Sequence, residues 1–177
     1  MEFSIPFGGQ ALNAVDGKGR VSLPADLRAT VDRRAAQALN ANMPVDDKLL
    51  YIAEDEELPC LTGFDETEYF ALAGELREQR SRETSGGGRK SLIRRDGGGT
   101  ETFAPLQRVV FDKAGRMVLS SLLREIGGIE DFAFFTGNGP YFDIWSPARA
   151  HSHYAAMGDK RLLRVLEHLC REKGMAL

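Results

Sequence analysis

The chain has 177 residues, of which 42% are hydrophobic and 28% charged, and this suits one compact globular unit or two small halves. Its formal net charge of −3 excludes a basic field over the whole molecule, so any nucleic-acid surface has to be local. We expect no signal peptide and no membrane span, because no apolar run approaches about 18 residues. The two cysteines, Cys60 and Cys170, suit a reducing cytoplasm.

The first part of the chain predicts a hairpin, a helix, two strands and a second helix. Strands are expected from two-residue alternation or short apolar runs at 10–15, 20–24, 48–53 and 59–64. The turn "DGKG" joins the first two of them into a β-hairpin. Helices are expected at 24–40, where Pro24 suits the first turn, and at 65–82, where Asp65 is the expected N-cap. The apolar stripe of the second helix consists of Tyr69, Leu72 and Leu76.

Residues 84–101 form a break in composition between the two parts of the chain. Two glycine triplets indicate a mobile connector, or two loops around the short apolar run at 91–93. The stretch at 77–95 is also rich in lysine and arginine. Such a segment is either a solvated linker or a contact for the DNA backbone or an acidic partner.

The second part of the chain repeats the order of the first. Strands are expected at 104–111, 116–120, 131–137 and 141–145, with a tight turn at Asn138–Gly139. Ser120 is expected to cap a short helix that Gly127 and Gly128 end. An amphipathic helix is expected at 160–173.

One short pattern occurs twice. The stretch "DGKGRVSLPADLR" at 16–28 returns as "DKAGRMVLSSLLR" at 112–124, at a constant spacing and in the same order of elements. An internal repeat of this size is typical of two half-units related by a pseudo-twofold axis, each too small to bury a large core alone. The recurring residues are Asp16, Gly19, Arg20, Leu23, Leu27 and Arg28, which return as Asp112, Gly115, Arg116, Leu119, Leu123 and Arg124.

Each copy of the turn presents a pair of cations. The first carries Lys18 and Arg20 and the second carries Lys113 and Arg116, while the aspartate that opens each turn is placed to brace it. A guanidinium group binds phosphate or the guanine edge through two hydrogen bonds, and a β-ribbon can enter the DNA major groove. The two turns therefore indicate a DNA-reading element. The alternative is two solvated turns that recur only because the fold is duplicated.

The two motifs, with the strand pair that ends in "YFDIW" at 141–145, resemble the MraZ family of bacterial transcription regulators over about residues 7–155. The resemblance implies a mixed α+β, β-rich fold. In that fold two tandem AbrB-like swapped-hairpin units form a pseudo-twofold double-split β-barrel with flanking helices. The expected division is a first unit at 7–83, a Gly-rich basic connector at 84–101, a second unit at 102–155 and a C-terminal amphipathic helix at 156–177.

The same resemblance implies a cytoplasmic, nucleoid-associated regulator that represses the division and cell-wall gene cluster, its own operon included. It implies ring-like homo-oligomers that bind short direct repeats in double-stranded promoter DNA. Carried over residue by residue, the DNA-contacting positions are Lys18, Arg20, Lys113 and Arg116. The loop-structuring positions are Asp16, Gly19, Asp112 and Gly115.

Catalytic and cofactor chemistry has little support in the residues. The stretch "SGGGRKS" at 85–91 lacks the glycine that a phosphate loop places before its lysine, and we find no nucleophile elbow or dinucleotide fingerprint. No structural zinc spacing fits His151, His153, His168 and Cys170. We therefore expect no enzyme activity, no cofactor, no metal, no small-molecule substrate and no membrane partner.

One alternative to DNA binding stays open on the same scaffold. The chain would then be a protein–protein interaction or antitoxin-like module, with the helix at 160–173 as its docking face and the arginine turns as solvated loops.

Overall fold

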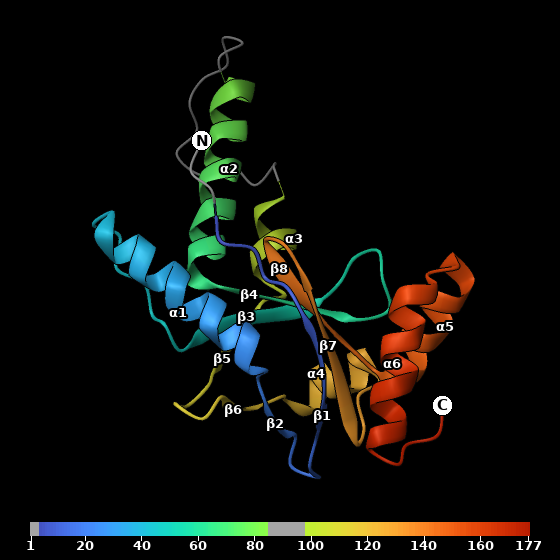
Figure 1. The fold of residues 1–177 in the computed structure, drawn as a ribbon. Helices are drawn as coiled ribbons and strands as arrows, with labels where there is room; N and C mark the ends of the chain where they lie inside the picture. Colours follow the sequence, from blue (N-terminus) through green and yellow to red (C-terminus); the bar gives the residue numbers. More distant parts are fainter. Residues whose placement is uncertain (1–3, 85–97) are drawn as a thin grey trace.

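The computed structural model describes residues 4–84 and 98–177, and these form antiparallel strands with helices packed around them (Figure 1). In these two ranges the strands are β1 (Gln10–Ala14), β2 (Arg20–Ser22), β3 (Leu49–Glu54), β4 (Leu61–Asp65), β5 (Gln107–Val110), β6 (Arg116–Val118), β7 (Phe132–Asn138) and β8 (Tyr141–Trp145). The helices are α1 (Ala25–Asn40), α2 (Glu66–Thr84), α3 (Gly99–Phe103), α4 (Ser121–Gly127), α5 (Pro147–Met157) and α6 (Lys160–Glu172). The mixed α/β class predicted from the sequence is confirmed.

The order of the strands reads the same when the two halves of the chain are exchanged. Six strands form one open sheet in the order β1-β7-β8-β4-β3-β5, and β2 pairs with β6 in a separate two-stranded ribbon. Replacing β1 by β5, β2 by β6, β3 by β7 and β4 by β8 leaves both orders unchanged. At the centre, Thr62 of β4 lies opposite Asp143 of β8. The two halves are therefore interlocked, and the paired strands β4 and β8 form the seam between them.

The hairpin expected at 10–24 is wrong in its strand pairing, although its turn is where the sequence predicts it. The backbone N–H of Asp16 donates to the carbonyl of Arg20 at 3.1 Å, and beyond that bond the strands diverge. β1 pairs with β7 and β2 pairs with β6, so both partners come from the other half. The reason is that alternation marks a strand but does not choose its partner.

Several local predictions are confirmed by the helix ends. Asp65 caps α2, because its Oδ1 accepts from the backbone N–H of Glu68 at 3.3 Å. Ser120 caps α4 by accepting from the backbone N–H of Leu123 at 3.2 Å, and Gly128 ends that helix with a φ of 62°.

Other expectations are corrected. The tight turn falls one residue later than predicted, because Asn138 still pairs with Tyr141 and the loop is Gly139–Pro140. Helix α5 was not predicted. Of the connector expected at 84–101, residues 99–101 begin helix α3. Residues 85–97, which hold most of the glycines and part of the basic stretch, lie outside the described residues.

The buried side chains divide into a shared core and two outer clusters. The shared core joins residues from equivalent positions of the two halves. Its members include Val21, Leu23, Leu27, Met117, Leu119 and Leu123. Helices α5 and α6 cover a second cluster around Phe134 and Trp145, and α2 covers a third around Tyr51 and Phe64. In the described residues no helix is long and apolar enough to cross a membrane.

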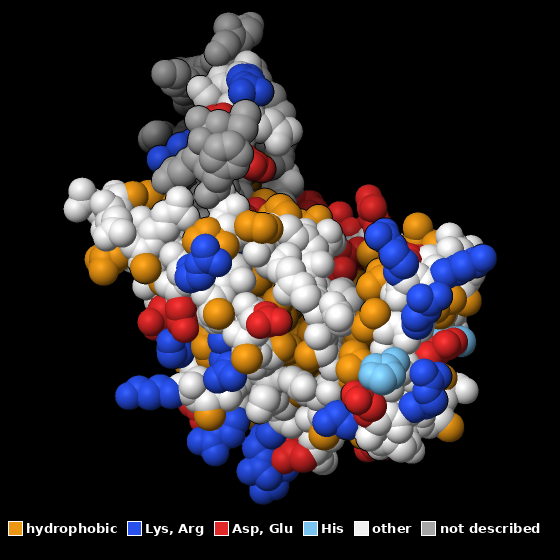
Figure 2. All heavy atoms as spheres, in the orientation of Figure 1, with side chains coloured by type: hydrophobic (Ala, Val, Ile, Leu, Met, Phe, Trp, Pro, Cys, Tyr) orange, Lys and Arg blue, Asp and Glu red, His pale blue; other side chains and the backbone are white. Residues whose placement is uncertain are grey.

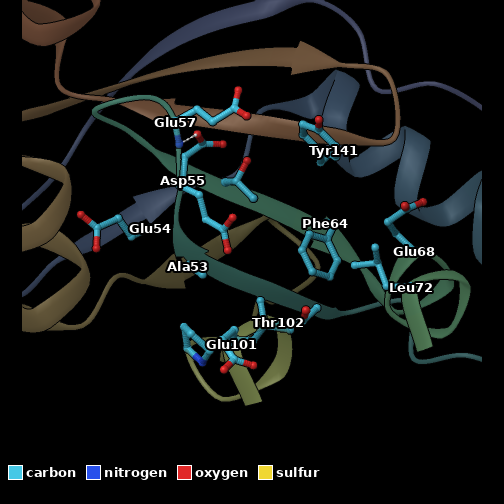
Figure 3. A pocket seen from close by; sticks show the side chains of 14 residues that line it. Ala53, Glu54, Asp55, Glu57, Phe64, Glu68, Leu72, Glu101, Thr102 and Tyr141 are labelled. Carbon is cyan, nitrogen blue, oxygen red and sulfur yellow. Dashed lines mark hydrogen bonds between the residues drawn. The ribbon is translucent and has the colours of Figure 1, made fainter. Parts of the chain in front are cut away.

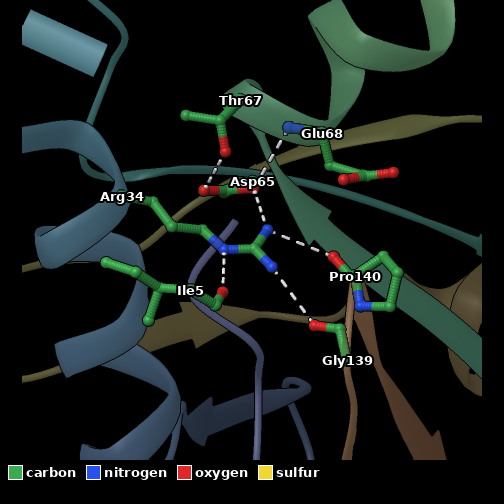
Figure 4. Close-up of polar contacts among 7 residues, drawn as sticks. All are labelled: Ile5, Arg34, Asp65, Thr67, Glu68, Gly139 and Pro140. Atoms are coloured by element: carbon green, nitrogen blue, oxygen red, sulfur yellow. Dashed lines mark hydrogen bonds and ion pairs between the residues drawn. The ribbon is translucent and has the colours of Figure 1, made fainter. Parts of the chain in front are cut away.

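A single buried arginine fixes the first helix to the rest of the fold. Arg34 of α1 is 2% exposed, and its side chain forms an ion pair with Asp65 (Figure 4). The guanidinium group also lies over the Phe7 ring, 4.3 Å from its centroid. Its donated hydrogen bonds go to Ile5 O at 2.6 Å, Asp65 Oδ1 at 3.0 Å, Gly139 O at 3.1 Å and Pro140 O at 3.2 Å. These bonds connect the N-terminal segment, the start of α2 and the β7–β8 turn.

The Arg34→Met variant should lower the free energy of unfolding by about 3–5 kcal/mol, because it leaves the Asp65 carboxylate buried without its partner. The matched control is Arg33→Met, which changes an exposed arginine one position earlier in the same helix. Denaturant unfolding followed by circular dichroism measures both. Equal losses in the two variants would contradict the role assigned to Arg34.

Candidate nucleic-acid interface

The first turn is held by the aspartate that opens it. Asp16 Oδ1 accepts from the backbone N–H groups of Lys18 and Arg20, both at 2.9 Å, and Asp16 Oδ2 accepts from Arg20 Nε at 2.5 Å. The N–H of Gly19 donates to the carbonyl of Asp16 at 2.9 Å. One carboxylate thus fixes both the loop backbone and the direction in which the arginine leaves it.

The second turn reproduces these contacts. Asp112 Oδ1 accepts from the backbone N–H groups of Ala114 at 2.9 Å and Arg116 at 3.0 Å, and Oδ2 accepts from Arg116 Nε at 2.7 Å. Gly115 donates to the carbonyl of Asp112 at 2.8 Å. The bracing expected of the two aspartates therefore has a direct geometric basis in both turns.

The same bonds change the acidity of the two aspartates. In each turn the pKa of the aspartate lies below its usual range, first because of the backbone N–H of the arginine and then because of the arginine side chain. Asp16 and Asp112 therefore remain ionised, and the braces remain formed, at any pH near neutrality.

The two turns lie side by side because each is hydrogen-bonded to the other half. The N–H of Leu23 donates to the carbonyl of Gly115 at 2.7 Å, and the N–H of Leu119 donates to the carbonyl of Gly19 at 2.9 Å. Both glycines have a φ of 81°. A Cβ on Gly19 would lie 2.3 Å from the Leu119 carbonyl oxygen, so the crossing needs glycine for space as well as for φ.

Two further arginines of the repeat pack against these glycines. Arg28 lies against Gly115 and donates from Nη1 to the carbonyl of Lys113 at 3.3 Å. Arg124 lies against Gly19 in the corresponding place. The sequence showed that both arginines recur, but gave them no role. Their positive charges add to the surface around the two turns.

The exposed face of the β2–β6 ribbon carries the predicted arginines. The side chains of Arg20 and Arg116 are 64% and 74% exposed, and Lys18 and Lys113 are exposed at the two loops. The space-filling view in Figure 2 shows lysine and arginine side chains gathered at the lower edge of the molecule. Figure 1 places the β1–β2 turn at this edge. The predicted DNA-contacting residues are thus brought together on one surface.

A groove of about 690 Å³ is lined by the ribbon strands β2 and β6 and by the neighbouring ends of β1 and β5. Residues of both halves line it, among them Arg20, Arg116 and Arg108 of β5. Arg108 was missed by the sequence analysis, because its only signal was a polar residue at an outward position of a strand. Its guanidinium adds a cation to the groove.

Acidic side chains gather at a different place. A hollow of about 810 Å³ is lined by Glu54, Asp55, Glu57, Glu68 and Glu101, with Phe64 and Leu72 among its apolar residues (Figure 3). Figure 2 shows acidic groups at the upper right, while lysine and arginine side chains lie both at the lower edge and on the right-hand side. The acidic hollow and the groove that contains Arg20 and Arg116 share no lining residue.

The residues considered as zinc ligands have other neighbours. His151 Nε2 lies 3.3 Å from Glu167, His168 Nε2 lies 3.4 Å from Glu172, and His153 stacks on Trp145. Cys170 is buried, and burial raises the pKa of its thiol. Within 4–84 and 98–177, no three His, Cys, Asp or Glu side chains are grouped as metal ligands would be.

One acid at the seam between the halves has an altered pKa. Burial is the main cause that raises the pKa of Asp143 to about 6, and the Asp55 carboxylate raises it further. Thr62 donates to Asp143 Oδ1 at 3.4 Å and opposes this shift. This acid therefore titrates well above an exposed aspartate.

These features define a class of protein: a mixed α/β chain of two interlocked halves that displays an arginine-bearing β-ribbon. Three relatives support a closer assignment. Transcriptional regulator MraZ of Gluconobacter oxydans is 30% identical over 158 residues, which cover 89% of this chain and 86% of that protein. The protein of the same name from Gluconacetobacter diazotrophicus is 28% identical over 151 residues, 84% of each chain.

The third relative is Transcriptional regulator MraZ of Parvibaculum lavamentivorans, 28% identical over 161 residues, which cover 88% of this chain and 84% of that protein. No family model matches the chain. The identity and coverage of these relatives show that the chain belongs to the MraZ family.

Gly19→Ala should destabilise the fold by about 1–3 kcal/mol, because the new Cβ meets the Leu119 carbonyl and strains a residue with positive φ. The control in the same turn is Gly17→Ala, whose Cβ has nothing within 4 Å. Thermal unfolding of both variants is the measurement. A Gly19→Ala protein as stable as the control would show that the close crossing of the turns is not required.

Asp143→Asn should make stability less dependent on pH. Because the folded pKa is raised to about 6, this acid stabilises the fold below the pKa of the unfolded chain, and that contribution is lost as pH rises through about 6. The variant should therefore gain about 1–3 kcal/mol relative to wild type on going from pH 4 to pH 8. Urea unfolding across this range, with the exposed Glu130→Gln as control, measures the difference. A constant difference at all pH values would contradict it.

Proposed function

We propose that the chain is a sequence-specific, DNA-binding transcription regulator that places the β2–β6 ribbon in the major groove of its site. The observation that carries this proposal is the pair of arginines on the outward face of the ribbon, each braced by an aspartate. The names of the three relatives support the transcriptional role. A two-stranded ribbon fits the major groove, which carries the fuller base code.

Arg20 and Arg116 read bases in this proposal, and the lysines set the position on the backbone. A guanidinium group pairs with guanine O6 and N7 through two hydrogen bonds, and the braces hold each side chain ready for that geometry. Lys18, Lys113 and Arg108 neutralise phosphates, which adds affinity without sequence information. The separated acidic hollow explains how a chain with a net charge of −3 presents a cationic surface to DNA.

The regulatory details are proposed from the family resemblance. The chain acts in the cytoplasm, at the nucleoid, as a repressor of the division and cell-wall gene cluster that includes its own operon. Ring-like oligomers align several ribbons on direct repeats spaced by about one helical turn, roughly 10 bp. Linking several weak ribbon contacts raises the apparent affinity by orders of magnitude.

The finer description of the fold belongs to the same proposal. Two AbrB-like swapped-hairpin units, at 7–83 and 102–155, form a double-split barrel that holds the ribbon. The palindromic strand order supports this division, because equivalent strands of the two parts make equivalent pairs.

A protein-interaction module is the second candidate. The sequence predicts the helix at 160–173 as the docking face of such a module, but the apolar face of α6 packs inside the chain, where Leu166 and Cys170 are buried. The surface that favours this candidate is instead the acidic hollow, whose charge and apolar residues fit a basic amphipathic segment. DNA-independent partner binding that survives loss of both Arg20 and Arg116 would support it.

Arg20→Ala should weaken binding to promoter DNA by about 1–3 kcal/mol for each engaged loop, while the fold and the assembly stay intact. Lys18→Ala should weaken binding to all sequences alike and reduce the salt slope by about one phosphate contact, near 0.9. The measurement is a salt titration by fluorescence anisotropy on the duplex upstream of the chain's own reading frame, compared with a scrambled duplex.

The control for this experiment is Arg33→Ala, an exposed arginine on helix α1. It should bind like the wild type. Wild-type affinity of Arg20→Ala, or equal affinity of the wild type for both duplexes, would refute the base-reading role.

A further inference from the structure

The two arginines of the ribbon have different neighbours across the strands. Arg20 lies directly opposite Val118, and Arg116 lies directly opposite Ser22. Directly opposed residues have their Cβ atoms about 4.5–5.5 Å apart. The outward face of the ribbon therefore carries Arg20 beside an aliphatic side chain and Arg116 beside a hydroxyl group.

Val118 is unusually exposed for a valine in this fold. It is 52% exposed, and Val110 at the end of β5 is 64% exposed, although the strand neighbours Met117 and Val109 are buried. Both exposed valines line the groove that contains Arg20 and Arg116. Two branched apolar side chains thus face outward between cations.

The fold does not require aliphatic residues at these two places. At the spacing of the repeat, Val118 corresponds to Ser22 and Val110 corresponds to Ala14. These counterparts occupy equivalent positions in the paired strands of the first half. Because the same backbone positions of the first half carry a serine and an alanine, packing alone does not explain the two valines.

We propose that Val118, supported by Val110, contacts the 5-methyl group of a thymine next to the guanine read by Arg20. This inference rests on the proposed function, since it assigns base specificity to the same ribbon. Successive base pairs are about 3.4 Å apart, so two opposed side chains can reach neighbouring pairs. Apolar contact with the thymine methyl is the one aliphatic signal in the major groove.

The two sides of the ribbon then read DNA unequally. Arg20 with Val118 selects a guanine flanked by thymine. Arg116 with Ser22 selects a guanine without a methyl preference, because a serine hydroxyl bonds to either kind of base. The repeat therefore gives one backbone geometry with two specificities.

The test uses the full chain and a duplex that the chain itself selects from a random pool. Each thymine of the selected duplex is replaced in turn by deoxyuridine, which removes only the 5-methyl group. Wild type should lose about fourfold in affinity at one or two positions, as expected for one buried methyl group. Val118→Ser, which copies the counterpart residue, should bind thymine and uracil duplexes equally.

Ser22→Val is the reciprocal variant and should gain a thymine preference beside Arg116. Circular dichroism checks that both variants fold, and the uracil series on wild type decides the matter if one does not. An unchanged affinity of wild type at every uracil position would overturn the inference and leave DNA binding standing. A uracil penalty that Val118→Ser retains would also overturn it. If no duplex is enriched, the proposed function fails and the inference fails with it.

Discussion

Each half of this chain completes its sheet with strands from the other half. β1 pairs with β7, β5 pairs with β3, and β2 with β6 joins the two turns in one ribbon. The distance between Arg20 and Arg116 is therefore set by backbone hydrogen bonds and does not depend on a flexible interface. Such preorganisation lowers the ordering cost of binding, which otherwise reduces the affinity that a few contacts can supply.

The pseudo-twofold backbone carries side chains that differ between the halves. Leu12 of β1 is buried in the cluster beneath α6, whereas its counterpart Arg108 of β5 is exposed and lines the groove. Helix α6 packs over Leu12 of β1 and Phe134 of β7 at one end of the sheet, whereas α2 packs over Tyr51 and Phe64 and the short α3 lies beside the acidic hollow. The edge strand β1 is thus covered by helix, whereas the edge strand β5 is exposed at Arg108 and carries its charge.

Local signals predicted most of the elements, and long-range pairing limited the rest. The turns at Asp16 and Asp112 and the cap at Ser120 are set by neighbouring residues, so the sequence located them. Strand partners, the contacts of Arg34 and the place of Arg108 depend on residues far away in the chain. No local period in the sequence contains that information. Alternation therefore predicted the wrong partners for the strands of the hairpin, and only the family resemblance implied that these strands pair with the other half.

The acids of this chain respond to pH in opposite ways. Asp16 and Asp112 accept hydrogen bonds as carboxylates, so their pKa values are lowered and the braces persist when the pH falls moderately. Asp143 is buried at the seam, so its pKa is raised and the seam becomes more stable in the same range. Mild acidification therefore raises the contribution of Asp143 to the stability of the fold without releasing the arginines. The aspartates that hold the arginines and the aspartate buried between β4 and β8 thus respond differently to added protons, because the first two are stabilised as carboxylates and the third as the neutral acid.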